Sequence, residues 1–320
     1  MPRPRLLGSA TLIALLLATA SSAAATDTTT PCGTATAATA EAVAGSVAAN
    51  IFRGELTGGE VLADAGRVRD SVPLLAAVAQ GNRAAAHRAV HALVYHPLWH
   101  IVRLRVLDST GRVLADIGGP YVIAPVTGTL RYEGNVVGTF VMSVQDDVGF
   151  TKLETHAVGD PIAVYYGGKL VAHLGARFPA SPPSLPTMNV GGAQYAVLNE
   201  TYGAFPTGTL LAVILVPPPP VALGAQPCIA VRASAIGSVA AHLATRFHPL
   251  DASYPKYVET LHTDTGAIAI LRIGTRPIAG SQGIGPAVIP TSGPVTYLGH
   301  TYWVFSFEPT PPARVYLLIS

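Results

Sequence analysis

The chain has 320 residues, which is long enough for two domains of ordinary size. Charged residues make up 12% of it, hydrophobic residues 49%, and the formal net charge is +2. So few charges exclude a charged coiled coil, a basic nucleic-acid-binding arm and a charged linker. The many glycines and prolines follow no Gly-X-Y period, which excludes collagen.

The first 25 residues are typical of a secretory signal peptide. Arg3 and Arg5 form its basic start, Leu12–Ala18 its apolar segment and Ala23–Ala25 a small-residue cleavage site. An uncleaved anchor is the alternative, but the apolar segment is shorter than the ~20 residues that span a bilayer. Removing the segment leaves 18 cationic and 18 anionic residues. We therefore expect a secreted or extracytoplasmic (cell-envelope) protein with no remaining membrane span and no nucleic-acid partner.

The two cysteines, Cys32 and Cys228, are predicted to form a disulfide, because oxidising compartments favour pairing. In the chain-entropy model, closing so long a loop stabilises the fold by about 5 kcal/mol. Two unpaired buried thiols are the alternative. Neither cysteine lies in a CxxC motif, so we expect a structural role and no redox chemistry.

Helical sequence precedes strand sequence in the first half of the chain. An alanine-rich helix is predicted over Ala37–Phe52, and a second helical stretch over Ser71–Tyr95, with an interruption at Gly81 and Asn82. The hydrophobic period then changes to that of strands separated by glycine-containing turns. The predicted strands are Ile101–Asp108, Arg112–Ile117, Tyr121–Val126, Gly128–Glu133 and Asn135–Asp146, with a further buried strand at Leu210–Val216.

Two parts of the chain match each other in the same order, which predicts an internal repeat. The matching pairs are Gly45–Ala49 with Gly237–Ala241, Pro161–Val164 with Ala267–Ile270, Gly191–Val197 with Leu298–Val304, and Pro206–Leu215 with Pro311–Leu318. The first copy contains an insert over about residues 54–159, and the proline run after Val216 is the natural linker between the copies.

Two segments, Trp99–Ala115 and Val136–Asp147, resemble a Cache domain, an extracytoplasmic sensor module related to PAS domains. The resemblance covers residues 70–155 and rests on a long helix that leads into a strand, an Asp-x-x-Gly turn and a second strand. It implies an α+β fold: a PAS/Cache-like antiparallel sheet with a long N-terminal helix, followed by a second, smaller PAS-like repeat. The predicted division is residues 1–25 signal peptide, 32–216 Cache-like sensor domain, 217–226 linker and 227–320 second α+β repeat.

The resemblance also implies a small-molecule pocket on one face of the sheet, often for amino acids or carboxylates. Strand alternation places Arg103 and Arg105 on one face and Leu104 on the other. Arginine suits a carboxylate because its planar guanidinium donates two charge-assisted hydrogen bonds at once. A solvated sheet face with weak Arg–Asp pairs is the alternative. The predicted ligand-binding residues are Trp99, Arg103, Arg105, Tyr121, Ser143 and Gln145.

Two other clusters contain residue types that can bind metals or transfer protons. His87 and His91 are spaced for one helix face, which suits a metal, but Arg88 lies between them and no HExxH motif is present. Asp146 and Asp147 are adjacent, and a helix cap or turn explains them better than acid–base catalysis. No nucleophile motif or nucleotide-binding loop is present, so we expect no catalytic residue, metal or cofactor.

The sequence therefore predicts an exported, non-catalytic sensor-type protein that binds a small polar or carboxylate ligand, with an envelope protein as a possible partner. The alternative is a structural or protein-interaction module of the cell envelope that binds no small ligand.

Overall fold

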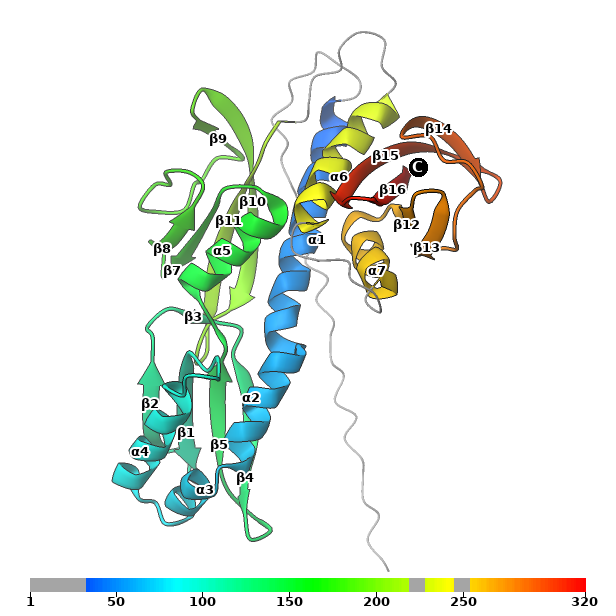
Figure 1. Cartoon of the computed structure of the whole chain (residues 1–320). Coiled ribbons are helices and arrows are strands. Elements are labelled where there is room, and N and C mark those ends of the chain that lie inside the picture. The colour runs from blue at the N-terminus through cyan, green and yellow to red at the C-terminus, as the bar shows by residue number, and fades with distance from the viewer. Residues whose placement is uncertain (1–32, 219–227, 245–253) are drawn as a thin grey trace, which may run out of the picture.

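The computed structural model describes residues 33–218, 228–244 and 254–320. The predicted signal peptide, Cys32 and most of the predicted linker lie outside these residues. The described chain is α+β, with several antiparallel sheets, and none of its described helices is long and apolar enough to cross a membrane. Figure 1 shows three lobes arranged along a long first helix. We name them the distal lobe (residues 59–143), the proximal lobe (33–57 and 147–216) and the C-terminal lobe (228–319).

The distal lobe is a four-stranded antiparallel sheet with helices on one face. Leu104, Val106, Phe140 and Met142 point toward these helices and form the core of the lobe, because alternate residues of a strand share a face. The other face carries Arg103 and Arg105. The helices are α2 (Gly59–Asp70), α3 (Val72–Ala79) and α4 (Arg83–Val94); the strand order is β2 (Val113–Gly118), β1 (Arg103–Asp108), β5 (Asn135–Ser143) and β4 (Val126–Tyr132).

The proximal lobe combines helices from both ends of the distal insert with one five-stranded sheet. Its helices are α1 (Gly33–Thr57) and α5 (Asp147–Val158). Asp146 caps α5 by accepting a hydrogen bond from the Gly149 amide at 2.6 Å, which confirms the predicted cap. The strand order is β8 (Lys169–Leu174), β7 (Ile162–Tyr166), β11 (Thr209–Val216), β10 (Ala193–Gly203) and β9 (Thr187–Val190), so the predicted buried strand is β11.

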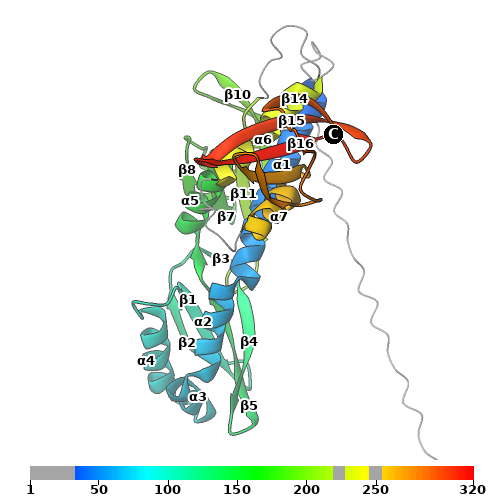
Figure 2. The ribbon, with the colours of Figure 1, turned by 45° about the vertical axis from the view of Figure 1, so that its right-hand side comes forward.

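The C-terminal lobe has the same arrangement without a distal insert. Its helices are α6 (Cys228–Ala244) and α7 (Tyr254–Thr265). Figures 1 and 2 both show α6 lying beside α1, and Asn50 of α1 donates a hydrogen bond to Asp264 of α7. The strand order is β13 (Arg276–Gly280), β12 (Ile268–Ile273), β16 (Ala313–Ile319), β15 (His300–Thr310) and β14 (Ser292–Tyr297). When the five strands of each lobe are counted along the chain, they lie in the same order in this sheet as in the proximal sheet.

A short two-stranded sheet joins the distal and proximal lobes. It consists of β3 (Val122–Ile123) and β6 (Gln145–Asp146). The tip of the β10–β11 hairpin reaches this junction, where the Phe205 amide donates to the Val122 carbonyl at 2.9 Å. The two-stranded junction sheet and the tip of the β10–β11 hairpin are therefore held together by backbone hydrogen bonds.

Two features of the structure differ from expectation, and a third agrees with it. The predicted single domain over residues 32–216 contains two sheets with separate cores. The helix α2 was not predicted, because the polar sequence of Gly59–Asp70 has a weak apolar period. The second predicted helix is divided into α3 and α4 at the expected glycine, where Gly81 has a φ of 63°.

The alignment of the repeat at Pro161–Val164 is one residue out of register. It equates Ile162 with Ile268, but Ile162 belongs to the core under the helices, and Ile268 belongs to a cluster on the opposite face of its sheet. Ala269 lies on the helix side and is the structural equivalent of Ile162. A shift of one residue exchanges the two faces of a strand, and similar aliphatic residues on both faces hide the shift in the sequence.

The cysteine that the structure describes, Cys228, is not a free thiol. It begins α6. The predicted bond to Cys32 involves a residue outside the described chain and stays a prediction.

Candidate functional site: an arginine pair at the junction of two lobes

Arg103 and Arg105 lie side by side on the face of the distal sheet that points away from its helices, and both bind Asp116 of the neighbouring strand β2. Arg103 donates from Nε and Nη2 to the two carboxylate oxygens, at 2.9 and 3.0 Å. Arg105 donates from Nε and Nη2 to Oδ2, at 2.9 and 2.6 Å. The strand register causes this arrangement, because Arg105 is directly opposite Asp116.

The electrostatics of Asp116 follow from this geometry. Partial burial acts to raise the pKa of its carboxyl group, but the hydrogen bonds and charges of Arg103 and Arg105 outweigh burial and lower the pKa below its ordinary value. The carboxylate is therefore ionised near neutral pH. Two guanidinium groups share one carboxylate, so the cluster keeps one uncompensated positive charge.

Phe205 from the proximal lobe covers the cluster. The guanidinium carbon of Arg103 lies 4.7 Å, and that of Arg105 5.8 Å, from the centre of the Phe205 ring, within the range of cation–π attraction. Phe205 is 3% exposed. The arginine pair is thus an electrostatic site of the distal lobe whose cover belongs to the proximal lobe.

The donors of the two arginines are not equally used. Nη1 of Arg103 donates to the Gly119 carbonyl at 2.9 Å, so all three nitrogens of that guanidinium have acceptors. Within the described residues, Nη1 of Arg105 makes no hydrogen bond, and the Arg105 side chain is 26% exposed. Arg105 is therefore the member of the pair that can still donate to an incoming acceptor.

Two of the other predicted site residues lie elsewhere. Trp99 packs against the core on the helix side of the sheet and stacks on His96 at 3.7 Å. The alternation failed there because β1 begins only at Arg103. Tyr121 is exposed, and its ring lies 6.0 Å from the ring of Tyr166 in the proximal lobe.

Ser143 and Gln145 belong to the junction between the lobes. Ser143 is 0% exposed; its hydroxyl donates to the Ile123 carbonyl and accepts from the Gln145 amide at 3.0 Å. Ser143 is therefore a structural residue with no surface for a ligand, although its register position is opposite Arg103. Gln145 lies in β6, outside the four-stranded sheet.

The histidines have separate neighbours. His91 packs against Tyr95, His96 against Trp99, and His100 pairs with Glu60. Among the described residues, no group of three or more potential ligands is placed to hold a metal ion.

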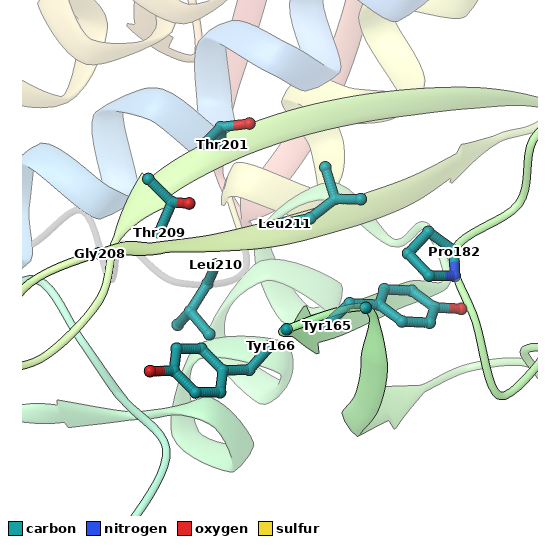
Figure 3. Close-up of a pocket in the computed structure, with 10 residues that line it drawn as sticks. Tyr165, Tyr166, Pro182, Thr201, Gly208, Thr209, Leu210 and Leu211 are labelled. Carbon is teal, nitrogen blue, oxygen red and sulfur yellow. The ribbon is translucent and has the colours of Figure 1, made fainter.

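The outward face of the proximal sheet carries an open pocket of about 490 Å³. Figure 3 shows that its lining comes from β7, the β7–β8 turn, the facing ends of β10 and β11, and one loop residue. The lining residues are Tyr165, Tyr166, Gly167, Gly168, Pro182, Thr201, Gly208, Thr209, Leu210 and Leu211. The predicted pocket with Arg103 and Tyr121 in its lining is not this one, but Tyr121 contacts it through Tyr166.

Sequence reasoning missed Asp116 and Phe205. Asp116 had a usable signal, because it is a charged residue inside a predicted strand next to a strand with two arginines. Phe205 had none, since it is 100 positions away in sequence and reaches the arginines only through the packing of two lobes.

No protein-family model and no curated protein sequence matches the chain. Among solved structures, it is similar to an extracellular ligand binding receptor from Desulfohalobium retbaense DSM5692, with 14% sequence identity and a TM-score of 0.27. The similarity covers 54% of this chain and 39% of the receptor. The chain therefore spans well under half of the receptor's length.

Proposed function

We propose that the chain is an extracytoplasmic, non-catalytic recognition protein of Cache type, which binds a small carboxylate ligand at Arg103 and Arg105. The observation that carries this proposal is the excess positive charge of two guanidinium groups that share Asp116 on a sheet face without helices. A carboxylate that binds there neutralises that charge and accepts from the free Nη1 of Arg105.

The arrangement of the lobes supports the sensor class. The proximal and C-terminal sheets have the same strand order, and each follows a helix with the same five-residue sequence. This supports an internal duplication of a PAS-like lobe, with the distal lobe inserted into the first copy. The insertion places the arginine pair against Phe205, so that a ligand on the distal lobe also meets a residue of the proximal lobe.

A structural role without a small ligand is the second candidate, and one observation favours it. Each of the three guanidinium nitrogens of Arg103 has an acceptor, and both guanidinium groups lie against Phe205. In that case, the cluster serves as a contact between lobes and the molecule recognises a protein of the envelope through another surface.

Thermal unfolding against a panel of amino acids, monocarboxylates and dicarboxylates separates the two candidates. A ligand present at about a hundred times its dissociation constant adds about 2.7 kcal/mol of stability. We expect a carboxylate to raise the melting temperature of the wild type and to have no effect on Arg105→Gln, because that variant removes the charge and keeps a polar side chain. If no ligand of the panel raises the melting temperature of the folded protein, the structural role is favoured.

The C-terminal lobe supplies the matched control. Arg314 pairs with the exposed Glu308, so Arg314→Gln removes one charged member of an Arg–carboxylate pair far from the proposed site. A carboxylate response that survives in Arg105→Gln, or that Arg314→Gln abolishes equally, refutes recognition by the arginine pair.

A further inference from the structure

One stretch of strand β10 lacks a partner strand on its outer side, the side away from β11. Strand β9 pairs with Ala193–Ala196 of β10, and β3 bridges to Ala204 beyond the end of β10. Figure 1 shows β9 near one end of the β10–β11 hairpin and β3 near the other. Within the described residues, no strand pairs with the outer side of Leu198–Tyr202 between them. We name Leu198–Tyr202 the open edge.

The direction of the backbone groups along the open edge follows from its two ends. The Val197 amide donates outward to the residue before β9, and the Gly203 carbonyl accepts from the residue after β3. Successive residues of a strand direct these groups to alternate sides, so Asn199 and Thr201 also direct their N–H and C=O groups outward. No other described residue bonds these groups on that side. Both residues are exposed, so the open edge presents unpaired donors and acceptors at the spacing of a strand.

Helix α1 covers the inner face of the open edge. Gly45 of α1 lies against Leu198 and Glu200, and Phe52 of α1 stacks on Tyr202 with 4.5 Å between the ring centres. The opposite face, which carries the side chains of odd-numbered residues, is the outward face of the sheet. A strand added at the open edge therefore has one face toward α1 and the other toward solvent.

Glu200 gives the open edge a charge. Its side chain is half-buried, and burial raises the pKa of its carboxyl group. No cation or hydrogen-bond donor among the described residues offsets this burial. A carboxylate held away from water without an opposite charge is unfavourable. A basic side chain directly opposite Glu200 on an added strand supplies that charge, because directly opposite residues of paired strands share a face and lie within contact distance.

The same charge disfavours pairing with a second copy of this chain. Two antiparallel copies of β10 centred on the open edge place their Glu200 side chains opposite each other, and like charges in that position are destabilising. Inward-pointing charges protect edge strands from self-association in this way. The occupant that fits the open edge is therefore a strand of different sequence, with a basic residue opposite Glu200.

The C-terminal lobe does not combine these features. Strand β14 pairs with β15 from His300 to Phe305, and Phe305 is the structural equivalent of Leu198. The pairing thus extends two residues further along the strand than in the proximal lobe. Phe307 takes the place of Glu200. Of these two lobes, only the proximal lobe has both a short edge strand and a half-buried carboxyl group beside the uncovered segment.

We propose that the open edge of β10 binds an extended segment of a partner protein, which pairs with Asn199 and Thr201 and carries a lysine or arginine opposite Glu200. Backbone hydrogen bonds supply affinity in this mode of recognition, and alternate side chains supply specificity. The segment spans about five residues, or ~17 Å at ~3.4 Å per residue. The proposal goes beyond carboxylate recognition and is independent of Arg105.

Amide hydrogen exchange measured by NMR tests whether the open edge is accessible. In the free protein, we expect the amides of Asn199 and Thr201 to exchange fast and those of Leu198 and Glu200, which face β11, to exchange slowly. Slow exchange of Asn199 and Thr201 in the free protein means that the chain itself covers this edge, which overturns the proposal.

Isothermal titration with two blocked peptides tests the occupant. The basic probe is acetyl-Thr-Val-Thr-Lys-Thr-Val-Thr-amide, in which valine and lysine share the face toward α1, and the acidic probe has glutamate in place of lysine. We expect the basic probe to bind the wild type with a dissociation constant below 1 mM, and the acidic probe to bind at least about fivefold more weakly. On binding, the basic probe is expected to slow the exchange of the Asn199 and Thr201 amides.

Two variants separate the contributions of charge and backbone. Glu200→Gln is expected to bind both probes within about twofold of each other. Thr201→Pro removes an outward N–H that the β11 ladder does not use, a substitution that edge strands tolerate, and is expected to bind the basic probe about tenfold more weakly. Melting temperatures verify folding, and Glu200→Gln carries the test if Thr201→Pro does not fold.

Glu259→Gln, at an exposed position of α7, removes a carboxylate elsewhere and is the matched control. It is expected to keep the wild-type preference for the basic probe, as is Arg105→Gln. The proposal is overturned if neither probe binds the folded wild type at millimolar concentration, if both probes bind equally well, or if Glu200→Gln keeps the full preference. A failure of carboxylate binding is seen in Arg105→Gln and a failure of peptide binding in Glu200→Gln, so the two proposals are tested separately.

Discussion

The proximal and C-terminal lobes have the same strand order but differ in what lies between helix and sheet. In each lobe, a glycine of the long helix faces the fourth strand: Gly45 faces Leu198 and Glu200, and Gly237 faces Phe305. Glu200 and Phe307 occupy the same register position in the two sheets. The C-terminal lobe therefore has aromatic packing where the proximal lobe keeps a half-buried carboxyl group.

A second acidic group extends the difference. Asp160 lies at the junction of α5 and β7 and is 8% exposed. The corresponding junction of the C-terminal lobe passes from Gly266 directly to Ala267 with no acidic residue. The C-terminal lobe has its buried carboxyl group at a different place: Asp264 of α7 is 5% exposed and accepts a hydrogen bond from Asn50 of α1. The two lobes therefore differ in where they bury a carboxyl group: at the junction of α5 and β7 in the proximal lobe, and on α7 in the C-terminal lobe.

The largest expected effect concerns pH. Burial raises the pKa of Asp160 to about 7 from its ordinary 3.8. Between these values, the folded protein holds a proton that the unfolded chain has lost, so the free energy of unfolding falls as pH rises from about 4 to 7 and levels off above. Asp160→Asn cannot lose this proton. At pH 8 we therefore expect its free energy of unfolding to exceed that of the wild type by up to about 4 kcal/mol, at ~1.4 kcal/mol per pKa unit.

Urea unfolding from pH 4 to 8 measures this effect as the difference between wild type and Asp160→Asn. The subtraction removes the contribution of every ionisable group that the substitution leaves unchanged. Asp70→Asn, at an exposed helix end, is the control and is expected to show no such difference. A flat difference curve for Asp160→Asn contradicts the contrast between the two lobes.

The helix glycines give the next largest effect. A Cβ at Gly237 would lie 2.2 to 2.4 Å from three atoms of the Phe305 ring, whereas at Gly45 it would meet the Glu200 carboxylate oxygen at 3.1 Å. The ring cannot move aside without repacking, so we expect Gly237→Ala to destabilise the protein by about 3 kcal/mol. Gly45→Ala is expected to be neutral or stabilising by less than about 1 kcal/mol, because Glu200 can turn away and alanine favours the helix.

Thermal melting by circular dichroism compares these two variants directly. We expect the melting temperature to fall by several degrees for Gly237→Ala and to stay near the wild-type value for Gly45→Ala. Equal effects in both variants mean that the two helix–sheet contacts are equally tight, against the structural difference described above.

The sequence predicted the elements whose patterns are local. The helix around Gly45, the turn at Gly81 and the cap at Asp146 each follow from a few adjacent residues. The alternation around Leu104 also placed Arg103 and Arg105 correctly on the face without helices. Local patterns were insufficient for Trp99, which precedes the start of β1, and for Ser143, whose burial results from the junction of two lobes.

The candidate sites depend still more on distant packing. Asp116 meets the arginines through strand pairing, but Phe205 and the Tyr121–Tyr166 contact require the distal and proximal lobes to be placed together. No spacing in one sequence encodes that placement. An insert over about residues 54–159 was predicted, but not that it has a sheet and a core of its own, since both sheets continue the same strand-like period.

The smallest expected effect compares two cation–π contacts. Phe205 joins the distal and proximal lobes by lying over Arg103, and Tyr316 makes a similar contact with Arg272 inside the C-terminal lobe. Phe205→Leu and Tyr316→Leu keep an apolar group and remove the ring. Each is expected to lose about 1 kcal/mol of attraction to its arginine. A double-mutant cycle of each with Arg103→Gln or Arg272→Gln isolates that pairwise energy from other losses.

The two contacts differ in what else they influence. Because Phe205 covers the proposed carboxylate site, Phe205→Leu is expected to change carboxylate affinity as well as stability, by about threefold to fivefold for a change near 1 kcal/mol. Tyr316→Leu is expected to change stability alone. If both variants leave carboxylate affinity unchanged, Phe205 is only a packing residue between lobes, and its contact is equivalent to the one that Tyr316 makes inside the C-terminal lobe.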